Sequence, residues 1–311
     1  MQRKNFTEVT EFIFLGFSFL GKHQITLFVV FLTIYILTLT GNVVIMTIIC
    51  VDHHLHTPMY FFLGMLASSE TVYTLVSVPQ MLSGLLFHNQ PISLAGCATQ
   101  MFFFVILATN NCFLLTAMGY DCFVAICNPL RYTVLMSKGV CATLVCGSFG
   151  TGLVMAVLHV AAMFSVPFCG TVVEHYFCDI DPVMKLSCTD ITINEMINYG
   201  VSSFVILVPV GLIFISYVFI ISTILKIASI EGWKKAFATC ASHLTVVTVH
   251  YSCASIAYLK PKSENSVEKD LLSVTYTIIT PLLNPVVYSL RNKEVKDALC
   301  RAVGKKHYSK D

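Results

Sequence analysis

Charged residues are scarce in this chain of 311 residues. Asp, Glu, Lys and Arg make up 12% of it, against roughly 25% in soluble domains, whereas 56% of the residues are apolar and the mean hydropathy is +0.77. Disorder requires low hydrophobicity and high charge, so this composition excludes a disordered chain and argues against an ordinary soluble enzyme. With a net charge of only +2, the chain has no global basic field, and we expect no nucleic-acid partner.

The sequence also lacks the motifs of common catalytic and metal centres. It contains no Gly-rich phosphate loop, no HExxH and no GxSxG, and its 13 cysteines form neither a CxxC pair nor a Cys–His pattern with zinc spacing. We therefore expect that the protein is not an enzyme. It has no internal repeat, which argues against the duplicated halves of many transporters, and no low-complexity linker, which favours one membrane domain.

What the chain does contain is seven long stretches that are nearly free of charge. Each has at least about 20 residues, the length of a helix that crosses the hydrocarbon core. Buried helices of a large soluble core are the alternative, but helices with almost no polar face would leave too little polar surface. We predict an all-α membrane protein with a seven-transmembrane helix bundle over residues 25–290. The stretches are Ile25–Cys50, Pro58–Phe87, Leu94–Tyr120, Val140–Gly170, Met196–Leu225, Ala236–Leu259 and Leu271–Leu290.

The distribution of Lys and Arg predicts the orientation of the bundle. Twelve of these residues fall on the side of the C-terminal tail and seven on the side of the N-terminus. The positive-inside rule then places residues 1–24 outside the cell and the tail, residues 291–311, in the cytoplasm. Asn5 opens the tripeptide Asn-Phe-Thr, a glycosylation acceptor that is useful only on the outer side.

Four cysteines fall on the predicted outer side, where the compartment is oxidising: Cys97, Cys169, Cys178 and Cys188. They can form two disulfides, and their spacing leaves three pairings open.

Glu70 is the one acid deep in a predicted span. An intramembrane carboxylate is costly and has to be protonated, paired or bound to a cation. Asn111 and Asn284 are candidate partners, and a protonated packing residue is the alternative.

Five longer motifs narrow the family. The box Asn284-Pro285-x-x-Tyr288, together with seven spans and an outer N-terminus, resembles a rhodopsin-like G-protein-coupled receptor. The motifs together resemble an odorant receptor of the tetrapod-type class II, and the run His250–Pro261 resembles family 10 and its J subfamily. The five motifs are Leu55–Leu63 (LHTPMYFFL), Met118–Tyr132 (MGYDCFVAICNPLRY), Ser216-Tyr217, Lys235–Leu244 (KAFATCASHL) and Pro281–Asn292 (PLLNPVVYSLRN).

The resemblance implies the partners and several structural features. The ligand is a small hydrophobic odorant held in the helix bundle, and the partner is a stimulatory G protein of the olfactory type that raises cyclic AMP. Membrane lipid surrounds the protein, which is expected in the plasma membrane and in the cilia of olfactory sensory neurons. The tail is expected to hold a short amphipathic eighth helix. The implied disulfides are Cys97 to Cys178 and Cys169 to Cys188, with Cys97 to Cys188 as the alternative pairing.

The resemblance also implies a polar cluster of Glu70, Asn111 and Asn284, and a sodium ion in this cluster is the one cofactor that we expect. The odorant pocket is implied between the outer halves of the third, fifth, sixth and seventh helices. Val105, Ala108 and Cys112 share one helical face, as do Tyr251 and Ser255. The set is mostly apolar and uncharged, which suits a neutral, oily ligand, although each face can also be helix-packing core. Its members are Phe104, Val105, Ala108, Thr109, Cys112, Ser202, Val205, Ile206, Tyr251, Ser255, Tyr258 and Thr277.

One departure from the family bears on signalling. The family's Asp-Arg-Tyr triplet reads Asp121-Cys122-Phe123 here, and cysteine can neither carry the charge of arginine nor reach as far. We expect a weaker resting lock on Asp121, because its neighbour is neutral, and weaker contact with the G protein. A receptor-like protein with weak or lost coupling is therefore the alternative function; a channel or transporter would need repeats or several intramembrane charges. The remaining switch residues that the motifs indicate are Tyr217, Asn284, Pro285 and Tyr288.

Overall fold

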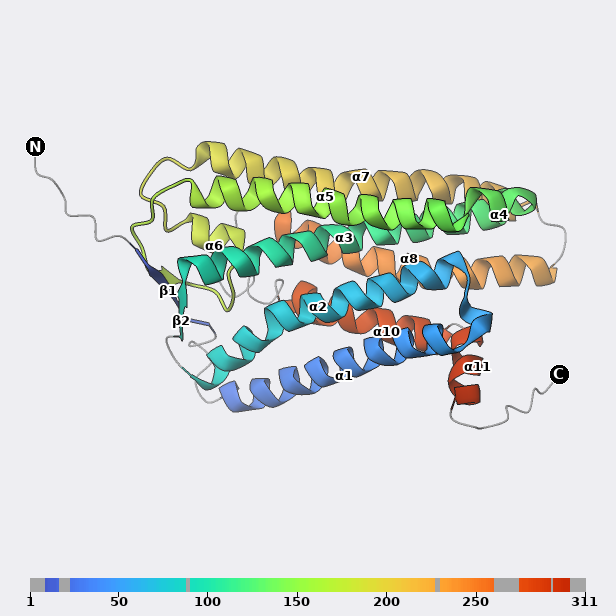
Figure 1. The fold of residues 1–311 in the computed structure, drawn as a ribbon, viewed down its shortest axis with the longest axis horizontal. Coiled ribbons are helices and arrows are strands. Elements are labelled where there is room, and N and C mark those ends of the chain that lie inside the picture. The colour runs from blue at the N-terminus through green and yellow to red at the C-terminus, as the bar shows by residue number, and fades with distance from the viewer. Residues whose placement is uncertain are drawn as a thin grey trace, which may run out of the picture.

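The protein is a bundle of long helices that run side by side (Figure 1). The structure is a computed structural model, and it describes residues 9–16, 23–87, 90–226, 230–259, 274–291 and 293–302. Five of the described helices are long and apolar enough to cross a membrane. With α8 and the helix formed by η4 and α10, they make up the seven-helix bundle, so the predicted fold class is confirmed. The long elements are α1 (Gln24–Val51), α2 (Pro58–Leu86), α3 (Leu94–Cys127), α5 (Lys138–Phe164), α7 (Thr192–Ile224), α8 (Ile230–Tyr258), and the π-helical η4 (Thr275–Ile279), which continues into α10 (Thr280–Arg291).

Capping serines and prolines mark the ends of several helices. Ser93 caps α3 by accepting a hydrogen bond from the backbone N–H of Gly96, and Ser137 caps α5 in the same way. Pro58 occupies the first turn of α2, where its missing N–H costs nothing. The π-helical turn of η4 runs directly into Pro281, which cannot donate the backbone hydrogen bond of a regular helix.

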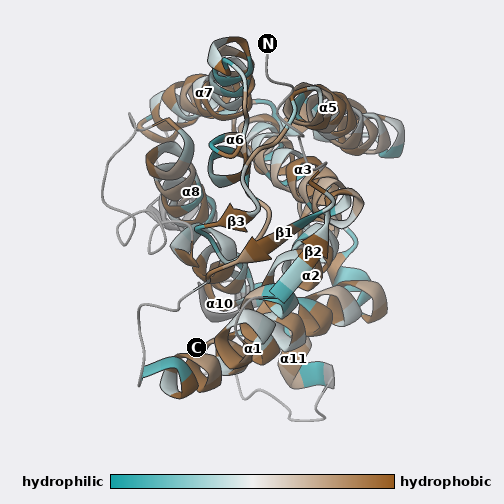
Figure 2. Ribbon diagram, turned by 90° about the vertical axis from the view of Figure 1, so that its left-hand side faces the viewer, coloured by the Kyte–Doolittle hydropathy of each residue, from teal (hydrophilic) through white to brown (hydrophobic). Residues whose placement is uncertain are grey.

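Helix α3 forms the centre of the bundle and packs against α2, α5, α7 and α8. Its contact with α5 is close because Gly152 has no side chain: a Cβ there would lie 2.6 Å from the carbonyl oxygen of Ile106. Gly41 of α1 makes room for Pro285 of α10 in the same way. The outward faces of the helices are apolar (Figure 2), and Phe214 of α7 is 68% exposed. Lipid is the solvent that suits such a surface.

Short elements connect the helices. They are η2 (His53–Leu55), η3 (Pro129–Arg131), α4 (Tyr132–Leu135), α6 (Ile180–Met184) and α11 (Lys293–Ala302). Helix α11 is the short amphipathic eighth helix that the resemblance implied. It buries Val295 and Ala298, and two polar contacts join it to the α1–α2 region. Arg301 pairs with Asp52 at 2.6 Å, and Tyr60 donates a 2.7 Å hydrogen bond to Glu294.

A small sheet crosses the end of the bundle opposite α11 (Figures 1 and 2). Strand β1 (Glu11–Phe14) lies between β2 (Gln90–Ser93), which is antiparallel to it, and β3 (Val172–Val173), which is parallel. From the sequence we predicted an outer N-terminal segment, and no strand was predicted there. Phe12 and Phe14 are buried while Glu11 is exposed, so the segment has the alternation of a strand over only four residues. Asn5, the predicted glycosylation site, lies outside the described residues.

Candidate functional site

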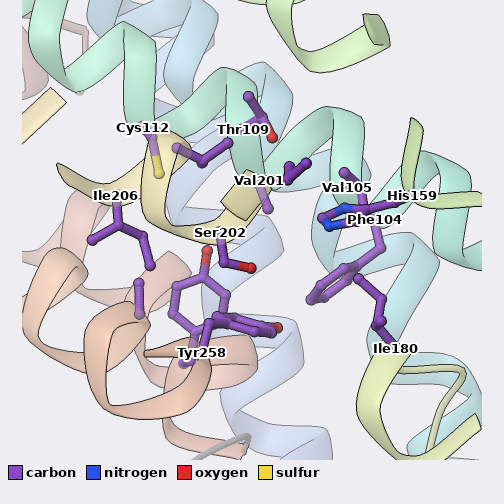
Figure 3. A pocket seen from close by; sticks show the side chains of 14 residues that line it. Phe104, Val105, Thr109, Cys112, His159, Ile180, Val201, Ser202, Ile206 and Tyr258 are labelled. Carbon is purple, nitrogen blue, oxygen red and sulfur yellow. The ribbon is translucent and has the colours of Figure 1, made fainter. Parts of the chain in front are cut away.

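A pocket lies between the helices, beside Ile180 of α6 (Figure 3). Its volume is about 60 Å³. Helices α3, α7 and α8 supply most of its wall, and α5, α6 and η4 each add one residue. The lining residues are Phe104, Val105, Ala108, Thr109, Cys112, His159, Ile180, Val201, Ser202, Val205, Ile206, Ala254, Tyr258 and Tyr276.

Most of the predicted ligand residues line this pocket. Those that do are Phe104, Val105, Ala108, Thr109, Cys112, Ser202, Val205, Ile206 and Tyr258. Tyr251, Ser255 and Thr277 do not line it. Tyr251 is instead tied to the backbone of α3, because its hydroxyl donates a 2.7 Å hydrogen bond to the carbonyl of Cys112. Thr277 is buried near Tyr73 of α2.

Five lining residues were not predicted: His159, Ile180, Val201, Ala254 and Tyr276. Val201 precedes the predicted Ser202 and lies one turn before Val205, so the helical repeat of α7 is a signal that would have included it. His159 belongs to α5, a helix for which we predicted no pocket residue. The approach of α5 to α3 at Gly152 brings this helix close enough to contribute.

The pocket is an apolar space with a few polar atoms. Among the described residues, no Asp, Glu, Lys or Arg lines it. Hydroxyl groups come from Thr109, Ser202, Tyr258 and Tyr276, and Cys112 adds a thiol that lies 3.4 Å from Nε2 of His250. Such a lining can hold a small uncharged molecule by shape and by one or two hydrogen bonds.

The long loop before α7 forms a lid over this end of the bundle. A disulfide joins Cys97 of α3 to Cys178, and a second joins Cys169 to Cys188. These are the pairs that the resemblance implied, and Cys97 is not paired with Cys188. The backbone N–H of Cys178 also donates a 3.1 Å hydrogen bond to Gln100 of α3. The lid is therefore fastened to α3 both covalently and by a hydrogen bond.

Two titratable groups are buried in the lid. Burial raises the pKa of Asp179 to about 7, and the neighbouring Asp181 adds to this rise. Burial lowers the pKa of His175 to about 4. The His175 ring stacks on Tyr176, with 4.3 Å between the ring centroids. Both groups thus favour their uncharged forms in the folded lid.

Below the pocket, Glu70 of α2 meets Asn284 of α10. The amide Nδ2 of Asn284 donates a hydrogen bond to Oε1 of Glu70. The other carboxyl oxygen of Glu70, Oδ1 of Asn284 and Oδ1 of Asn111 are buried and have no hydrogen-bond partner among the described residues. Glu70 and Asn284 are in contact, and carboxyl and amide oxygens of this kind are the ligands that hard cations prefer.

At the end of the bundle that carries α11, Asp121 and Cys122 are both buried. The hydroxyl of Tyr132 on α4 donates a 2.7 Å hydrogen bond to Asp121. The sequence predicted a weakened hold on Asp121 because residue 122 is neutral, but Tyr132, eleven residues further along the chain, supplies a donor. Cys122 instead lies near Tyr217 of α7 and Cys240 of α8.

Tyr217 belongs to a chain of hydrogen bonds that joins α7, α8 and α3. His243 of α8 lies 2.9 Å from the carbonyl oxygen of Leu115 through Nε2 and 2.9 Å from the Tyr217 hydroxyl through Nδ1. A carbonyl oxygen only accepts, so Nε2 carries the proton and Nδ1 accepts from Tyr217. Gly119 leaves room for the ring, since a Cβ there would lie 3.3 Å from His243. The chain thus connects three helices at one histidine.

The remaining predicted switch residues also lie in this half of the bundle. Phe123 contacts the rings of Tyr120 and Phe219. Pro285 packs against Gly41 of α1, and Tyr288 is fully buried. The hydroxyl of Tyr288 has no hydrogen-bond partner among the described residues.

Comparison with known proteins agrees with this arrangement. Residues 31–306 match a family model described as olfactory receptor. The chain is 84% identical to mouse olfactory receptor 10J5 and 83% identical to human olfactory receptor 10J5, in each case over 98% of this chain and 99% of the relative. It is 69% identical to human olfactory receptor 10J1, over 98% of this chain and 96% of that protein. The chain therefore belongs to the olfactory receptor family of G-protein-coupled receptors, within family 10 and its J subfamily.

Proposed function

We propose that this receptor binds small, neutral, largely apolar volatile molecules in the pocket of Figure 3 and responds by activating a stimulatory G protein that raises cyclic AMP. The observation that carries the ligand class is the lining, which has apolar side chains, several hydroxyl groups and, in the part of the chain that the structure describes, no Asp, Glu, Lys or Arg. A charged amine or carboxylate would lose its hydration there without gaining an ion pair.

The response requires a connection between the pocket and the far end of the bundle. Cys112 lines the pocket on α3, and the same helix carries Leu115, whose carbonyl His243 contacts. A ligand that shifts α3 against α8 therefore acts on the contact between His243 and Tyr217. This continuity supports signalling through α3, α7 and α8, with the G protein at the end that carries α11.

The proposed setting is the plasma membrane, with the lid outside the cell and α11 in the cytoplasm, and the cilia of olfactory sensory neurons are the site that we infer. The disulfides of the lid support this orientation, because disulfides persist in oxidising compartments.

We further propose that the cluster of Glu70, Asn111 and Asn284 holds a sodium ion in the resting receptor. The support is the set of buried oxygens without partners in the described part of the chain. The ion would neutralise the Glu70 carboxylate between α2 and α10, and these helices would then be held together.

A panel of odorants with a cyclic AMP readout tests the ligand proposal. Val205→Phe fills the pocket, whereas Val208→Phe adds the same bulk at a position on α7 that is 39% exposed. We expect the first variant to lose its response to the largest active odorants and the second to respond as the parent does at equal surface expression. Equal responses in both variants would contradict the assignment of this pocket.

Tyr258→Phe tests the polar part of the lining. Loss of a neutral hydrogen bond costs about 0.5–1.5 kcal/mol, or roughly threefold to tenfold in potency. The shift should appear for odorants that carry an oxygen and stay small for hydrocarbons. If both classes shift equally, Tyr258 supports the helix through its ring contact with Tyr276 instead.

A receptor with weak coupling is the second candidate function. It is favoured by the buried thiol of Cys122 at the position of the family arginine.

A further inference from the structure

His159 is a buried polar side chain that lines the pocket. It is 6% exposed on α5, and neither ring nitrogen has a hydrogen-bond partner among the described residues. Figure 3 shows its imidazole ring reaching into the pocket beside Val105 and Phe104. Buried polar groups are nearly always hydrogen-bonded. A ring nitrogen that lacks a hydrogen-bond partner in the described part of the chain and faces a cavity therefore points to a partner that occupies the cavity.

A neighbour of this ring indicates which of its two nitrogens carries the proton. Asn198 of α7 lies beside His159. Its Nδ2 donates a 3.0 Å hydrogen bond to Asp181, and its Oδ1 has no hydrogen-bond partner among the described residues. An amide oxygen only accepts hydrogen bonds, so the N–H of a neutral His159 is the group that suits Asn198. The second ring nitrogen then has a lone pair and no proton.

The start of α7 is fixed relative to α5, which keeps this pair of residues together. One turn before Asn198, the side chain of Asn194 donates a hydrogen bond to the carbonyl oxygen of Ala162 on α5. Asp181, the acceptor for Asn198, belongs to α6 in the lid, next to Ile180, which lines the pocket. The ring therefore stands where α5, α7 and the lid meet.

We propose that His159 is a specificity-determining residue that accepts a hydrogen bond from a hydroxyl group of the odorant, so that the receptor favours alcohols and phenols with an apolar body. The inference rests on the proposed function of the pocket. An aldehyde, ketone or ester has no proton to offer to the acceptor nitrogen, and a hydrocarbon has no polar group at all. Such molecules leave His159 unpaired when they fill the pocket.

The test uses the full-length receptor and three compounds with the same carbon skeleton: an alcohol, the matching aldehyde and the matching hydrocarbon. His159→Phe keeps a ring and removes both nitrogens. We expect it to raise the half-maximal concentration of the alcohol by about threefold to tenfold and those of the other two by less than twofold. Met163→Leu, one turn along α5 and buried, is the matched control that should leave all three unchanged.

Asn198→Leu tests the orienting role separately. Without the amide oxygen the ring has no fixed tautomer, so the preference for the alcohol over the aldehyde should narrow while both compounds still bind. A variant that retains the full preference would contradict the role of Asn198 in setting the tautomer.

Binding is also measured without signalling, by the rise in melting temperature of the purified receptor with each compound, so that weak coupling does not hide the result. If His159→Phe weakens the binding of all three compounds equally, the histidine is a packing residue and the inference is wrong while the pocket stands. If no compound stabilises the parent and Val205→Phe also changes nothing, the proposed function of the pocket fails and this inference fails with it.

Discussion

The hydroxyl of Tyr132 lies 2.7 Å from Oδ1 of Asp121, and it donates the hydrogen bond. Both groups lie at the end of the bundle that carries α11, where the family arginine would follow Asp121 in the sequence. The cysteine at position 122 turns toward Tyr217 and Cys240 instead. The acid is therefore held by the short helix α4 and not by its neighbour on α3.

Removing that donor should destabilise the receptor. Tyr132→Phe deletes the hydroxyl and leaves a buried acid without this hydrogen bond, a loss of about 1.5–3 kcal/mol for a bond to a charged group. We expect a lower melting temperature of the purified receptor. Tyr120→Phe, which deletes a hydroxyl with no hydrogen bond among the described residues, is the control. Equal melting temperatures for Tyr132→Phe and the parent would mean that Asp121 is satisfied in another way.

Restoring the arginine should raise signalling. Cys122→Arg adds a charge that can reach the G protein, and a buried charge-assisted hydrogen bond of about 1.5–3 kcal/mol outweighs an exposed ion pair of about 0–1 kcal/mol. Since Tyr132 already holds Asp121, the resting state loses less from the cysteine than the sequence suggested. We expect a larger maximal cyclic AMP response, measured at equal surface expression, and the same rank order of odorants.

Cys122→Ala is the control for this substitution, because it changes the thiol without adding charge, and it should signal as weakly as the parent. A parent that responds as strongly as Cys122→Arg would show that the arginine is dispensable here.

The two disulfides should differ in their contribution to stability. Cys97 and Cys178 are 81 residues apart and Cys169 and Cys188 only 19. The larger loop loses more chain entropy in the unfolded state, by about 1 kcal/mol. Cys178→Ser should therefore reduce surface expression more than Cys188→Ser, as measured by surface staining of intact cells. The reverse order would show that local strain or misfolding of the lid dominates over chain entropy.

Two buried groups in the lid should change the stability of the fold with pH in opposite directions. The pKa of Asp179 is raised to about 7, so the folded state binds more protons than the unfolded state between about 4 and 7, and stability falls as the pH rises through that window. The pKa of His175 is lowered to about 4, so its contribution to stability falls as the pH drops from about 6.5 toward 4.

Single substitutions should separate these effects in melting temperatures measured from pH 4 to pH 8. Asp179→Asn should reveal the His175 slope, with stability that increases with pH. His175→Phe should reveal the Asp179 slope, with stability that decreases with pH. Profiles that remain parallel to the parent in both variants would show that neither group is desolvated in the folded lid.

If sodium binds at Glu70, replacing one carboxyl oxygen of this residue should abolish the sodium dependence of signalling. Glu70→Gln keeps the oxygen that accepts from Asn284 and removes the negative charge. If the cluster binds sodium, replacing sodium chloride by choline chloride should change basal signalling in the parent and not in Glu70→Gln. Glu294→Gln, at a carboxylate in α11, should retain the parent's sodium dependence. Identical sodium dependence in the parent and Glu70→Gln would leave Glu70 as a protonated packing acid.

The long helices were predictable because they follow from composition, and the pocket residues were implied by the family resemblance, with which the helical repeat agrees. The face of α3 from Val105 to Cys112 turns inward as a unit, since residues three and four apart share one side. The repeat does not say which face of another helix turns inward. His159 is, from sequence, a neutral residue in an uncharged stretch, and only the approach of α5 at Gly152 brings it to the pocket. Tyr251, in contrast, was expected in the pocket and does not line it, because its hydroxyl donates a hydrogen bond to the backbone of α3.

Individual hydrogen bonds and strand pairings could not be predicted from the sequence either. The Tyr132–Asp121 hydrogen bond depends on how α4 folds back after Pro129, and the residue type at position 132 does not predict it. The strand at Glu11–Phe14 depends on partners that lie far along the chain.

The order of that sheet has a consequence for synthesis. Its central strand is made first, yet its partners end at Ser93 and Val173. Residues 11–14 therefore leave the ribosome with nothing to pair with, and their second edge stays open until more than half of the chain has been made. During that interval Phe12 and Phe14, which the finished receptor buries, can serve as a template for other strands. The sheet is thus a late-closing part of the molecule, and its central strand is the segment that waits longest for its partners.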